Sequence, residues 1–229
     1  PKKAVNKSKQ TKNSIDTKVF ALGGLNEVGK NMYCVEHDNE LFIIDAGVKF
    51  AEEGLPGIDY VIPDYSYLKR NEKKIRGLMI THGHEDHIGG IPFLLQVVKI
   101  PFIYATPLAS AMIKRKLDEK RLTNATKIIQ IDDEYQIKSK YFNIGFFKTN
   151  HSIPESMGII INSPNGRIVE TGDFKFDLSP VGDPADYQKM SFLGETGVTL
   201  LMSDSTNSEV PTFSISEKKV ANSVQEEFR

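Results

Sequence analysis

The sequence has a single cysteine and no tryptophan in 229 residues. One cysteine, Cys34, excludes a disulfide within the chain and a zinc site built from several thiolates. No apolar run approaches the length of about 18 residues that a membrane-spanning helix needs. Any metal bound by this chain must therefore use histidine and carboxylate ligands.

A secretory signal and a strong net charge are also missing. The N-terminal stretch PKKAVNKSKQTKNSIDTK is polar and rich in lysine, with no apolar segment, so we expect a soluble protein of the cytoplasm with no membrane partner. A formal net charge of −1 does not carry the signature of a strongly basic nucleic-acid binder. Residues 1–17 are expected to form a solvated, disordered Lys-rich tail, and the alternative of an arm that reaches phosphates stays open.

Short apolar runs separated by turns begin at Lys18 and predict three strands in KVFALGG, NMYCVE and LFIIDAG. GLMIT and FIYAT are predicted as further strands, IPFLLQVV as a helix and PLASAMIKRKLDEKR as the clearest helix. Strands return over residues 126–170, where Pro164-Asn165-Gly166 predicts a hairpin turn, and again in VTLLMSDS. Strand-rich halves with helices between them indicate an α/β fold, a two-sheet sandwich with αββα layers.

The C-terminal part is predicted to be helical near DYQKMSFLG and again in EKKVANSVQEEFR. Ser214 and Glu217 have the spacing of a capping box before the second helix. Because that helical pattern reaches Arg229 without a stop signal, we expect the natural protein to continue beyond it.

The stretch THGHEDHIGG, residues 81–90, directly follows the predicted strand GLMIT and contains four potential ligands, His82, His84, Asp86 and His87. Residues two apart in an extended segment point to the same side, so His82 and His84 can face one ion. Imidazole and carboxylate suit Zn²⁺, with Mn²⁺ as the alternative, and a set without cysteine is typical of a catalytic site. Solvated histidines in a glycine-rich turn are the bland alternative, which four ligand types within six positions disfavour.

Two later residues can extend this cluster. His151 follows the predicted strand FFKTN, and Asp173 follows RIVET, so both lie at strand ends. Alone, such a histidine is more often a surface residue and such an aspartate a turn former. Together with the first cluster, they become candidate ligands that could complete a two-ion site.

THGHEDHIGG, NHSIPES, GDFKFD and SDSTNS together resemble the metallo-β-lactamase fold and, within it, the β-CASP nucleases of the bacterial ribonuclease J family. GGLNEVGKNMY and IIDAGVKF are similar to the first strands of that family. The resemblance runs from Lys18 to Arg229. It implies a metallo-β-lactamase domain over residues 18–207 and the start of a β-CASP domain, cut short, over residues 208–229.

The resemblance also implies a centre of two zinc ions. By this resemblance, His82, His84 and His151 would hold one ion. Asp86 and His87 would hold the other, and Asp173 would bridge the two. A hydroxide shared by two ions suits hydrolysis of a phosphodiester, and Asp86 could also orient that hydroxide as a catalytic residue.

Two further aspartates match motifs of the family. Asp45, in IIDAG, matches a residue that supports the site by hydrogen bonding without binding metal. Asp204, in SDSTN, matches a β-CASP acidic residue thought to assist proton transfer and is the second candidate catalytic residue. Glu85 is not assigned to metal.

RNA is the implied substrate, cleaved internally and by 5′-to-3′ exonuclease action in rRNA processing and mRNA decay. The implied partners are further copies of the chain in a dimer or tetramer, a paralogue, or an RNA-decay assembly. In that family the last histidine ligand, the remaining β-CASP motifs and the 5′-phosphate pocket lie further along the chain. We therefore expect residues 1–229 alone to be inactive or very weakly active.

Two other functions remain open. Another metallo-β-lactamase hydrolase, such as a tRNA 3′-processing enzyme or a thioester hydrolase, would share the histidine cluster, but SDSTN argues against it. A catalytically silent paralogue could act as a structural partner, but such a protein has no chemical need for six intact ligands.

Three smaller features are given ordinary structural interpretations. Residues 24–30 nearly spell a phosphate-binding loop, but Asn31 replaces the Ser or Thr and a strand follows, so the glycines are assigned to a tight strand connection. His37 is expected to be exposed beside a turn. Phe146, Phe147, Phe174 and Phe176 are expected in the core.

Overall fold

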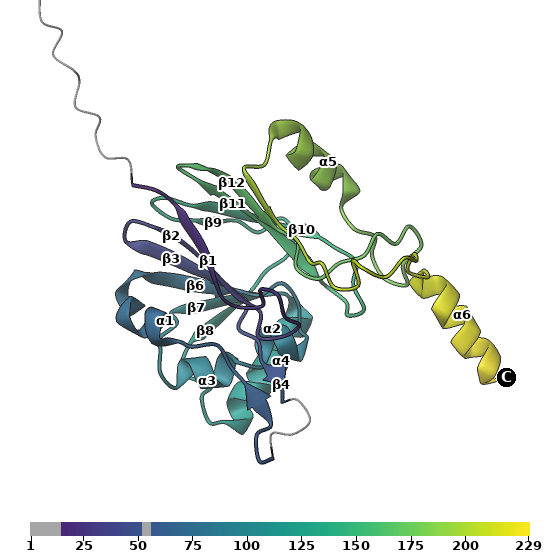
Figure 1. Cartoon of the computed structure of the whole chain (residues 1–229), viewed down its shortest axis with the longest axis horizontal. Coiled ribbons are helices and arrows are strands. Elements are labelled where there is room, and N and C mark those ends of the chain that lie inside the picture. Colours follow the sequence, from purple (N-terminus) through teal and green to yellow (C-terminus); the bar gives the residue numbers. More distant parts are fainter. Residues whose placement is uncertain (1–14, 52–55) are drawn as a thin grey trace, which may run out of the picture.

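The computed structural model describes residues 15–51 and 56–229, which form two β-sheets packed face to face with helices on the outer sides (Figure 1). The predicted α/β sandwich with αββα layers is thereby confirmed. Most of the predicted tail, residues 1–14, lies outside the described residues. Thr17, near its end, donates its hydroxyl to Asn165 Oδ1 at 2.8 Å.

The first sheet has the strand order β1-β2-β3-β6-β7-β8, antiparallel from β1 to β3 and parallel from β3 to β8. Its strands are β1 Lys18–Gly23, β2 Met32–His37, β3 Glu40–Ile44, β6 Ile75–Met79, β7 Phe102–Ala105 and β8 Lys127–Gln130. Parallel neighbours need crossover connections, which here contain helices. These helices are α1 Ser66–Arg70, a 3₁₀ turn Glu72–Lys74, α2 Glu85–Ile88, α3 Ile91–Leu95 and α4 Pro107–Glu119.

The second sheet has the order β13-β12-β11-β10-β9 and is antiparallel except for the pair β12 and β13. Its strands are β9 Ile137–Lys138, β10 Asn143–Lys148, β11 Met157–Ser163, β12 Gly166–Glu170 and β13 Leu200–Met202. The predicted hairpin joins β11 to β12, and Gly166 adopts a φ of 135° that favours glycine. A small ribbon of β4 Lys49–Phe50 and β5 Tyr60–Val61 lies outside both sheets.

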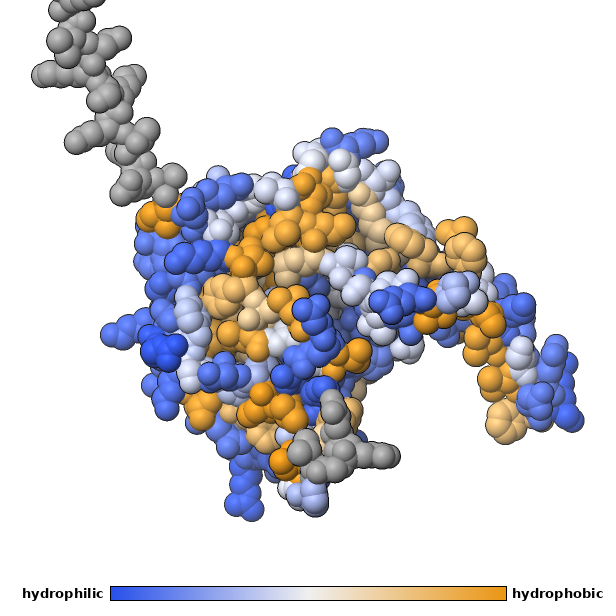
Figure 2. All heavy atoms as spheres, viewed as in Figure 1, coloured by the Kyte–Doolittle hydropathy of each residue, from blue (hydrophilic) through white to orange (hydrophobic). Residues whose placement is uncertain are grey.

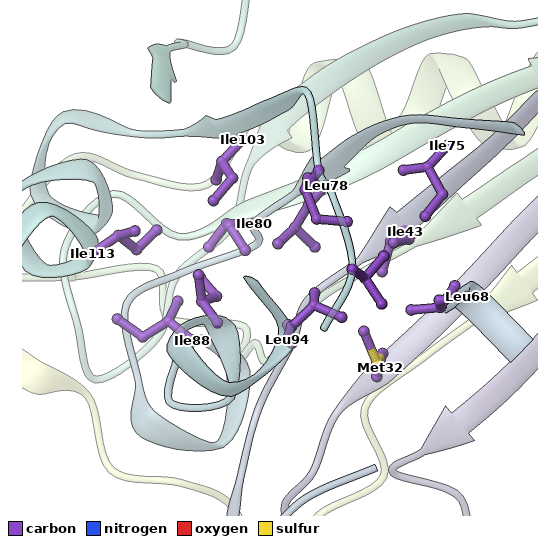
Figure 3. Packing of buried hydrophobic residues seen from close by; sticks show 14 of the residues in the cluster. Met32, Ile43, Leu68, Ile75, Leu78, Ile80, Ile88, Leu94, Ile103 and Ile113 are labelled. Atoms are coloured by element: carbon purple, nitrogen blue, oxygen red, sulfur yellow. The ribbon is translucent and has the colours of Figure 1, made fainter. Parts of the chain in front are cut away.

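Apolar side chains fill both the space between the sheets and the space under the helices. Figure 3 shows Ile80, Ile88, Leu94 and Ile113 gathered between the first sheet and its helices, and all four are fully buried. Phe42, Phe146 and Ile159 belong to the layer between the two sheets. Strand β3 is buried along its whole length, and its residues after Glu40 form the continuous apolar run LFII.

The outer side of the second sheet is covered by α5, Tyr187–Thr196. The Asp186 carboxylate caps this helix by accepting a hydrogen bond from the Lys189 backbone N–H at 2.8 Å. Leu193 is the buried residue of α5 and packs on Phe147 and Val169.

The last helix, α6 Glu217–Glu227, extends away from the body of the molecule (Figure 1). The predicted capping box at Ser214 and Glu217 is wrong, because Ser216 is the N-cap and accepts from the Lys219 N–H at 3.3 Å. Glu217 is therefore the first residue of the helix, and its own N–H donates to Asp177 Oδ2 at 2.7 Å.

Two other expectations about single side chains are wrong. His37 is only 5% exposed, since its ring packs on Tyr141 and its Nδ1 lies 3.0 Å from the Thr17 hydroxyl. Phe176 is 71% exposed, whereas Phe146 and Phe147 are buried as predicted.

Apolar side chains also reach the surface near the edge of the second sheet. Leu201, on the edge strand β13, is 61% exposed. Figure 2 shows hydrophobic residues gathered on this face of the molecule in the region where β13 lies, with hydrophilic residues around them. In the part of the chain that the structure describes, no helix is long and apolar enough to cross a membrane.

Candidate metal centre

The sequence-predicted ligands meet at one edge of the sandwich, where β6, β10 and β12 end. After β6 the chain runs through Thr81 and His82 into a short loop, and His84 is the N-cap residue of α2. Asp86 and His87 lie in the first turns of that helix. His151 comes three residues after β10, and Asp173 three residues after β12, so loops of both sheets contribute.

Three histidines form the first group. One ring nitrogen from each of His82, His84 and His151 lies within 4.8 Å of the others, an arrangement that could hold a metal ion. His84 Nδ1 is 3.1 Å from His82 Nε2 and 3.1 Å from His151 Nε2. Three converging imidazoles match the ligand set of a catalytic zinc site that keeps a further position for water or substrate.

A second group of possible ligands consists of His82, His87 and Asp173. Asp173 Oδ1 lies 3.4 Å from His87 Nε2, and its Oδ2 lies 3.6 Å from His151 Nε2. One carboxylate thus presents an oxygen to each histidine group. Asp86 stands beside this group, with its Oδ2 3.4 Å from His87 Nε2.

The supporting aspartate lies directly beneath the centre. Asp45 is 2% exposed and accepts hydrogen bonds from the Thr81 N–H at 2.8 Å and the Thr81 hydroxyl at 2.7 Å. His87 Nδ1 lies 2.7 Å from Asp45 Oδ2. An imidazole that donates its Nδ1 proton to a carboxylate keeps the Nε2 lone pair for a cation, so Asp45 fixes the tautomer that metal binding needs.

Burial and charge act differently on the members of the cluster. Burial, followed by the neighbouring histidines, lowers the pKa of His82 far below its usual value and keeps the ring neutral. Burial also lowers the pKa of His87, but Asp45 and Asp173 outweigh it and raise that pKa well above normal. Burial raises the pKa of the Asp86 carboxyl, but contact with His87 reverses this and lowers it. The site therefore carries carboxylate charge that a divalent cation would neutralise.

A backbone bridge ties together the loops that carry the two ligand candidates of the second sheet. Asn150 and Lys175 form an isolated antiparallel bridge, in which the Lys175 N–H donates to the Asn150 carbonyl at 2.8 Å. The Asn150 amide also donates to the Asp183 carbonyl at 2.8 Å and accepts from the Ala185 N–H at 3.0 Å. His151 and Asp173, close in sequence to this bridge, are thus tied to one frame.

Asp204 belongs to neither group of possible ligands among the described residues. Its N–H donates to the Thr171 hydroxyl at 3.2 Å, and its Oδ1 accepts from the Thr206 N–H at 2.7 Å. Together with Asp86 and Asp173 it lines a cavity of about 430 Å³. A second cavity, of about 490 Å³, is lined in part by His151, so the centre lies beside two hollows.

Two residues of the centre escaped the sequence analysis. Glu170, at the end of β12, is 7% exposed, and its Oε2 has no hydrogen-bond partner among the residues that the structure describes. Burial and the nearby Asp45 charge raise its pKa to about 8. Asn31 contacts both Asp86 and His87. The signal for Glu170 was its place at the end of a strand beside Asp173, whereas Asn31 was hidden in the glycine-rich stretch.

The donor set fits a divalent metal. Four of the chain's five histidines converge here with two carboxylates, and two of these histidines, His82 and His87, are buried. Imidazole and carboxylate donors of this kind suit Zn²⁺ or Mn²⁺.

Known proteins resemble this chain in sequence and in structure. A family model described as the Metallo-beta-lactamase superfamily matches residues 25–206. Ribonuclease J 1 of Streptococcus pyogenes is 57% identical over 206 residues, covering 90% of this chain and 37% of that protein. Ribonuclease J of Mycoplasma pneumoniae is 47% identical over 204 residues, covering 89% of this chain and 36% of that protein. The chain thus spans well under half the length of these relatives.

Solved structures with low sequence identity support the fold alone. A protein of unknown function from Enterococcus faecalis superposes with a TM-score of 0.65 at 18% identity, over 87% of this chain and 52% of that one. The short form of human tRNase Z gives a TM-score of 0.50 at 20% identity, over 72% of this chain and 71% of that one.

Proposed function

The chain belongs to the metallo-beta-lactamase superfamily, and on that premise we propose that the protein carrying it is a metal-dependent ribonuclease that hydrolyses RNA phosphodiester bonds with two zinc ions. The observation that carries the proposal is the position of Asp173, whose two oxygens face His87 and His151 of the two histidine groups. The RNA substrate is supported by the similarity to proteins named ribonuclease J.

The proposed ligands divide between the two positions. His82, His84 and His151 would hold one ion, Asp86 and His87 the other, and Asp173 would bridge them. Two bound divalent ions supply a hydroxide nucleophile at neutral pH and neutralise charge on the phosphate that is attacked. Mn²⁺ could replace Zn²⁺ with this ligand set.

The other residues orient these ligands and move protons. Asp45 receives the Nδ1 proton of His87 and keeps Nε2 directed at the centre. Asp86 faces the cavity of about 430 Å³, where it can orient the attacking water as well as bind metal. Asp204, on the wall of the same cavity, is the candidate that delivers a proton to the leaving oxygen.

The surroundings of the centre suit a polymer. Cavities of about 430 Å³ and 490 Å³ lie beside the histidine cluster, and residues of the centre line both. A strand of RNA could therefore contact the protein on both sides of the bond being cleaved. Cleavage inside the strand and removal of nucleotides from a 5′-monophosphate end are both compatible with this arrangement.

The setting of the protein belongs to the same proposal. Residues 18–207 would form the metallo-β-lactamase domain and residues 208–229 the start of a β-CASP domain. The protein would act in the cytoplasm as a dimer or tetramer, alone or with a paralogue in an RNA-decay assembly. Light scattering after size-exclusion chromatography of the full natural protein measures the number of subunits.

The decisive experiment uses the full natural protein that carries these residues. Zinc content is measured by elemental analysis, and cleavage is followed on RNA with a 5′-monophosphate, a 5′-triphosphate or a circular form without ends. We expect about two zinc ions per chain and cleavage that the His82→Ala/His84→Ala double variant abolishes. Glu85→Gln, at the first residue of α2, is the matched control, because the Glu85 carboxylate pairs with Lys116.

Three outcomes would contradict parts of the proposal. Unchanged zinc content in the double variant would refute the ligand assignment. Zinc binding without RNA cleavage by the wild-type protein would favour the silent-partner alternative. Wild-type turnover by residues 1–229 alone would refute the expectation that this part of the protein is inactive or very weakly active without the rest.

A further inference from the structure

Asn31 lies against the second group of ligands, although it comes from a different part of the chain. It ends the loop that joins β1 to β2, and its side-chain Nδ2 is 3.3 Å from Asp86 Oδ2 and 3.1 Å from His87 Nε2. Asp86 accepts a hydrogen bond as a carboxylate. The Nε2 of His87, whose Nδ1 is engaged by Asp45, lies beside the same amide. A single amide therefore donates to Asp86 and packs beside His87, the two side chains proposed to share an ion.

The backbone of Asn31 is fixed independently of its side chain. Its N–H donates to the Asp86 carbonyl at 3.0 Å, and its carbonyl accepts from the Gly47 N–H at 3.0 Å. Gly29 and Lys30, just before it, have φ values of 98° and 53°, which turn the chain toward the centre. The glycine-rich stretch thus serves to bring Asn31 to this place, and a change confined to the side chain leaves the backbone contacts intact.

The orientation of the amide is also defined. The Tyr33 hydroxyl lies 3.4 Å from Asn31 Oδ1 and 3.1 Å from the Gly24 carbonyl oxygen. The amide oxygen is thus directed toward Tyr33, and the NH₂ group toward Asp86 and His87. An amide can both accept and donate in this way, whereas an aliphatic side chain of similar size can do neither.

We propose that Asn31 is a positioning residue that, through its amide N–H, holds the Asp86 carboxylate in place beside the His87 imidazole for a shared divalent cation. The inference rests on the proposed function, because it takes Asp86 and His87 as ligands of the second ion. Residues that orient metal ligands typically change metal affinity by roughly 10- to 100-fold when they are lost. The histidine group of His82, His84 and His151 makes no hydrogen bond with Asn31 among the described residues, so its ion should be unaffected.

The test is a titration of the chelator-stripped full natural protein with Co²⁺, followed by its electronic absorption, which reports the two positions separately. Asn31→Ala should weaken binding of the second Co²⁺ ion by about 10- to 100-fold and leave the first unchanged. Asn31→Leu, which keeps the volume but cannot donate, should give the same loss. Tyr33→Phe should give a smaller loss with the same selectivity. Asn162→Ala, which removes an amide at the far end of β11, is the matched control.

Each result decides the matter. Selective weakening of the second ion in both Asn31 variants supports the proposal, whereas unchanged binding, or equal weakening of both ions, overturns it. Wild-type protein that binds a single Co²⁺ ion overturns it together with the two-ion centre. Failure of the proposed function has a different signature, since wild-type protein that binds two ions but cleaves no RNA refutes the ribonuclease and leaves the Asn31 titration valid.

Discussion

The two sheets contribute to the centre in different ways. The first sheet supplies four ligand candidates within six positions, because one loop and the first turns of α2 follow directly on β6. The second supplies His151 and Asp173 from two separate loops that the Asn150–Lys175 bridge ties together. One half of the centre is thus built by local geometry, and the other by contacts between distant parts of the chain.

The two sheets also differ in how much buried apolar packing lies on their outer sides. The first sheet has one extensive apolar cluster under its helices, while the outer side of the second has a small one around Phe147, Ile160, Val169 and Leu193. A ligand loop carried by the second sheet therefore depends more on its hydrogen bonds than on buried apolar area. The comparison teaches that the ligand candidates of the first sheet lie over the larger apolar cluster, whereas those of the second sheet lie in loops fixed mainly by hydrogen bonds.

The largest effect expected from this comparison separates His82 from His151. His82 belongs to both groups of possible ligands, whereas His151 belongs to one. We expect His82→Ala to weaken the first ion, which His82 is proposed to hold, by more than about a thousandfold. The second ion should weaken by the roughly 10- to 100-fold that loss of a supporting residue costs, because the His82 ring packs on His87. His151→Ala should weaken the first ion alone. Competition with a metal chelator measures both affinities, and equal losses in the two variants would contradict the division.

The same local-versus-distant contrast explains how much the sequence could predict. The HxHxDH spacing after a strand predicted the contribution of the first sheet because neighbours in sequence are neighbours in space there. The contribution of the second sheet could be proposed only for residues at strand ends, His151 and Asp173. Asn31 reaches the centre through a long connection that no spacing encodes.

The wrong expectations about His37 and Phe176 also arise where burial depends on contacts between distant parts of the chain. His37 is the last residue of β2, beside a turn, which suggests exposure, but Tyr141 from a later segment covers its ring. Phe176 lies in an apolar-looking alternation, but it stands outside both sheets and is 71% exposed. The strands and the main helices were predictable because the apolar period within each element reports its own burial. Side chains at loops take their environment from tertiary contacts.

A second prediction concerns Asp45, the buried carboxylate that connects Thr81 with His87 in the metal centre. Asp45 accepts from the Thr81 N–H, the Thr81 hydroxyl and His87 while almost fully buried. Asp45→Ala leaves these donors without a partner, so we expect the free energy of unfolding to fall by about 3 kcal/mol. Urea unfolding at pH 7 measures the loss. The exposed turn residue Asp64, changed to Ala, should cost much less, and similar values for the two would contradict the role of Asp45.

A third prediction concerns the ionisation of Glu170, a carboxyl buried between the two sheets close to Asp45. Glu170 of the second sheet is buried near Asp45 of the first, and its pKa is raised from 4.5 to about 8. A carboxyl with a raised folded pKa ionises more easily in the unfolded chain, so it lowers stability as pH rises from 4.5 toward 8. Glu170→Gln cannot ionise and should gain about 2 kcal/mol over the wild type between pH 6 and pH 8.

Chemical unfolding of Glu170→Gln and the wild type at pH 6 and at pH 8, with metals removed by a chelator, measures this difference in stability. Removal of metal is needed because a bound cation would favour the charged carboxylate. Glu227→Gln, in exposed α6, is the control and should show no such pH dependence. A variant whose stability parallels the wild type from pH 6 to pH 8 would show that Glu170 is not held neutral.

The smallest effect is expected at the hydrogen bond that joins the His151 loop to the start of α4. Glu155, exposed in that loop, accepts a hydrogen bond through its Oε2 from the Leu108 N–H at 2.7 Å, at the start of α4. A carboxylate at a helix N-terminus satisfies a free N–H and interacts favourably with the helix dipole. Glu155→Ala should therefore cost about 1 kcal/mol of unfolding free energy, and Glu155→Gln, which can still accept, about half of that.

The same two variants show whether this contact matters for the centre. Because Glu155 lies four residues from His151, loss of its hydrogen bond should free the loop and weaken the first ion by a few-fold while the second ion stays unchanged. Competition with a chelator measures the two affinities, and Glu119→Gln at the exposed end of α4 serves as the control. If Glu155→Ala lowered stability without changing either affinity, the position of His151 would not depend on the Glu155 contact, and the backbone bonds of the loop, such as that from the Met157 N–H to the Thr81 carbonyl, would hold it in place.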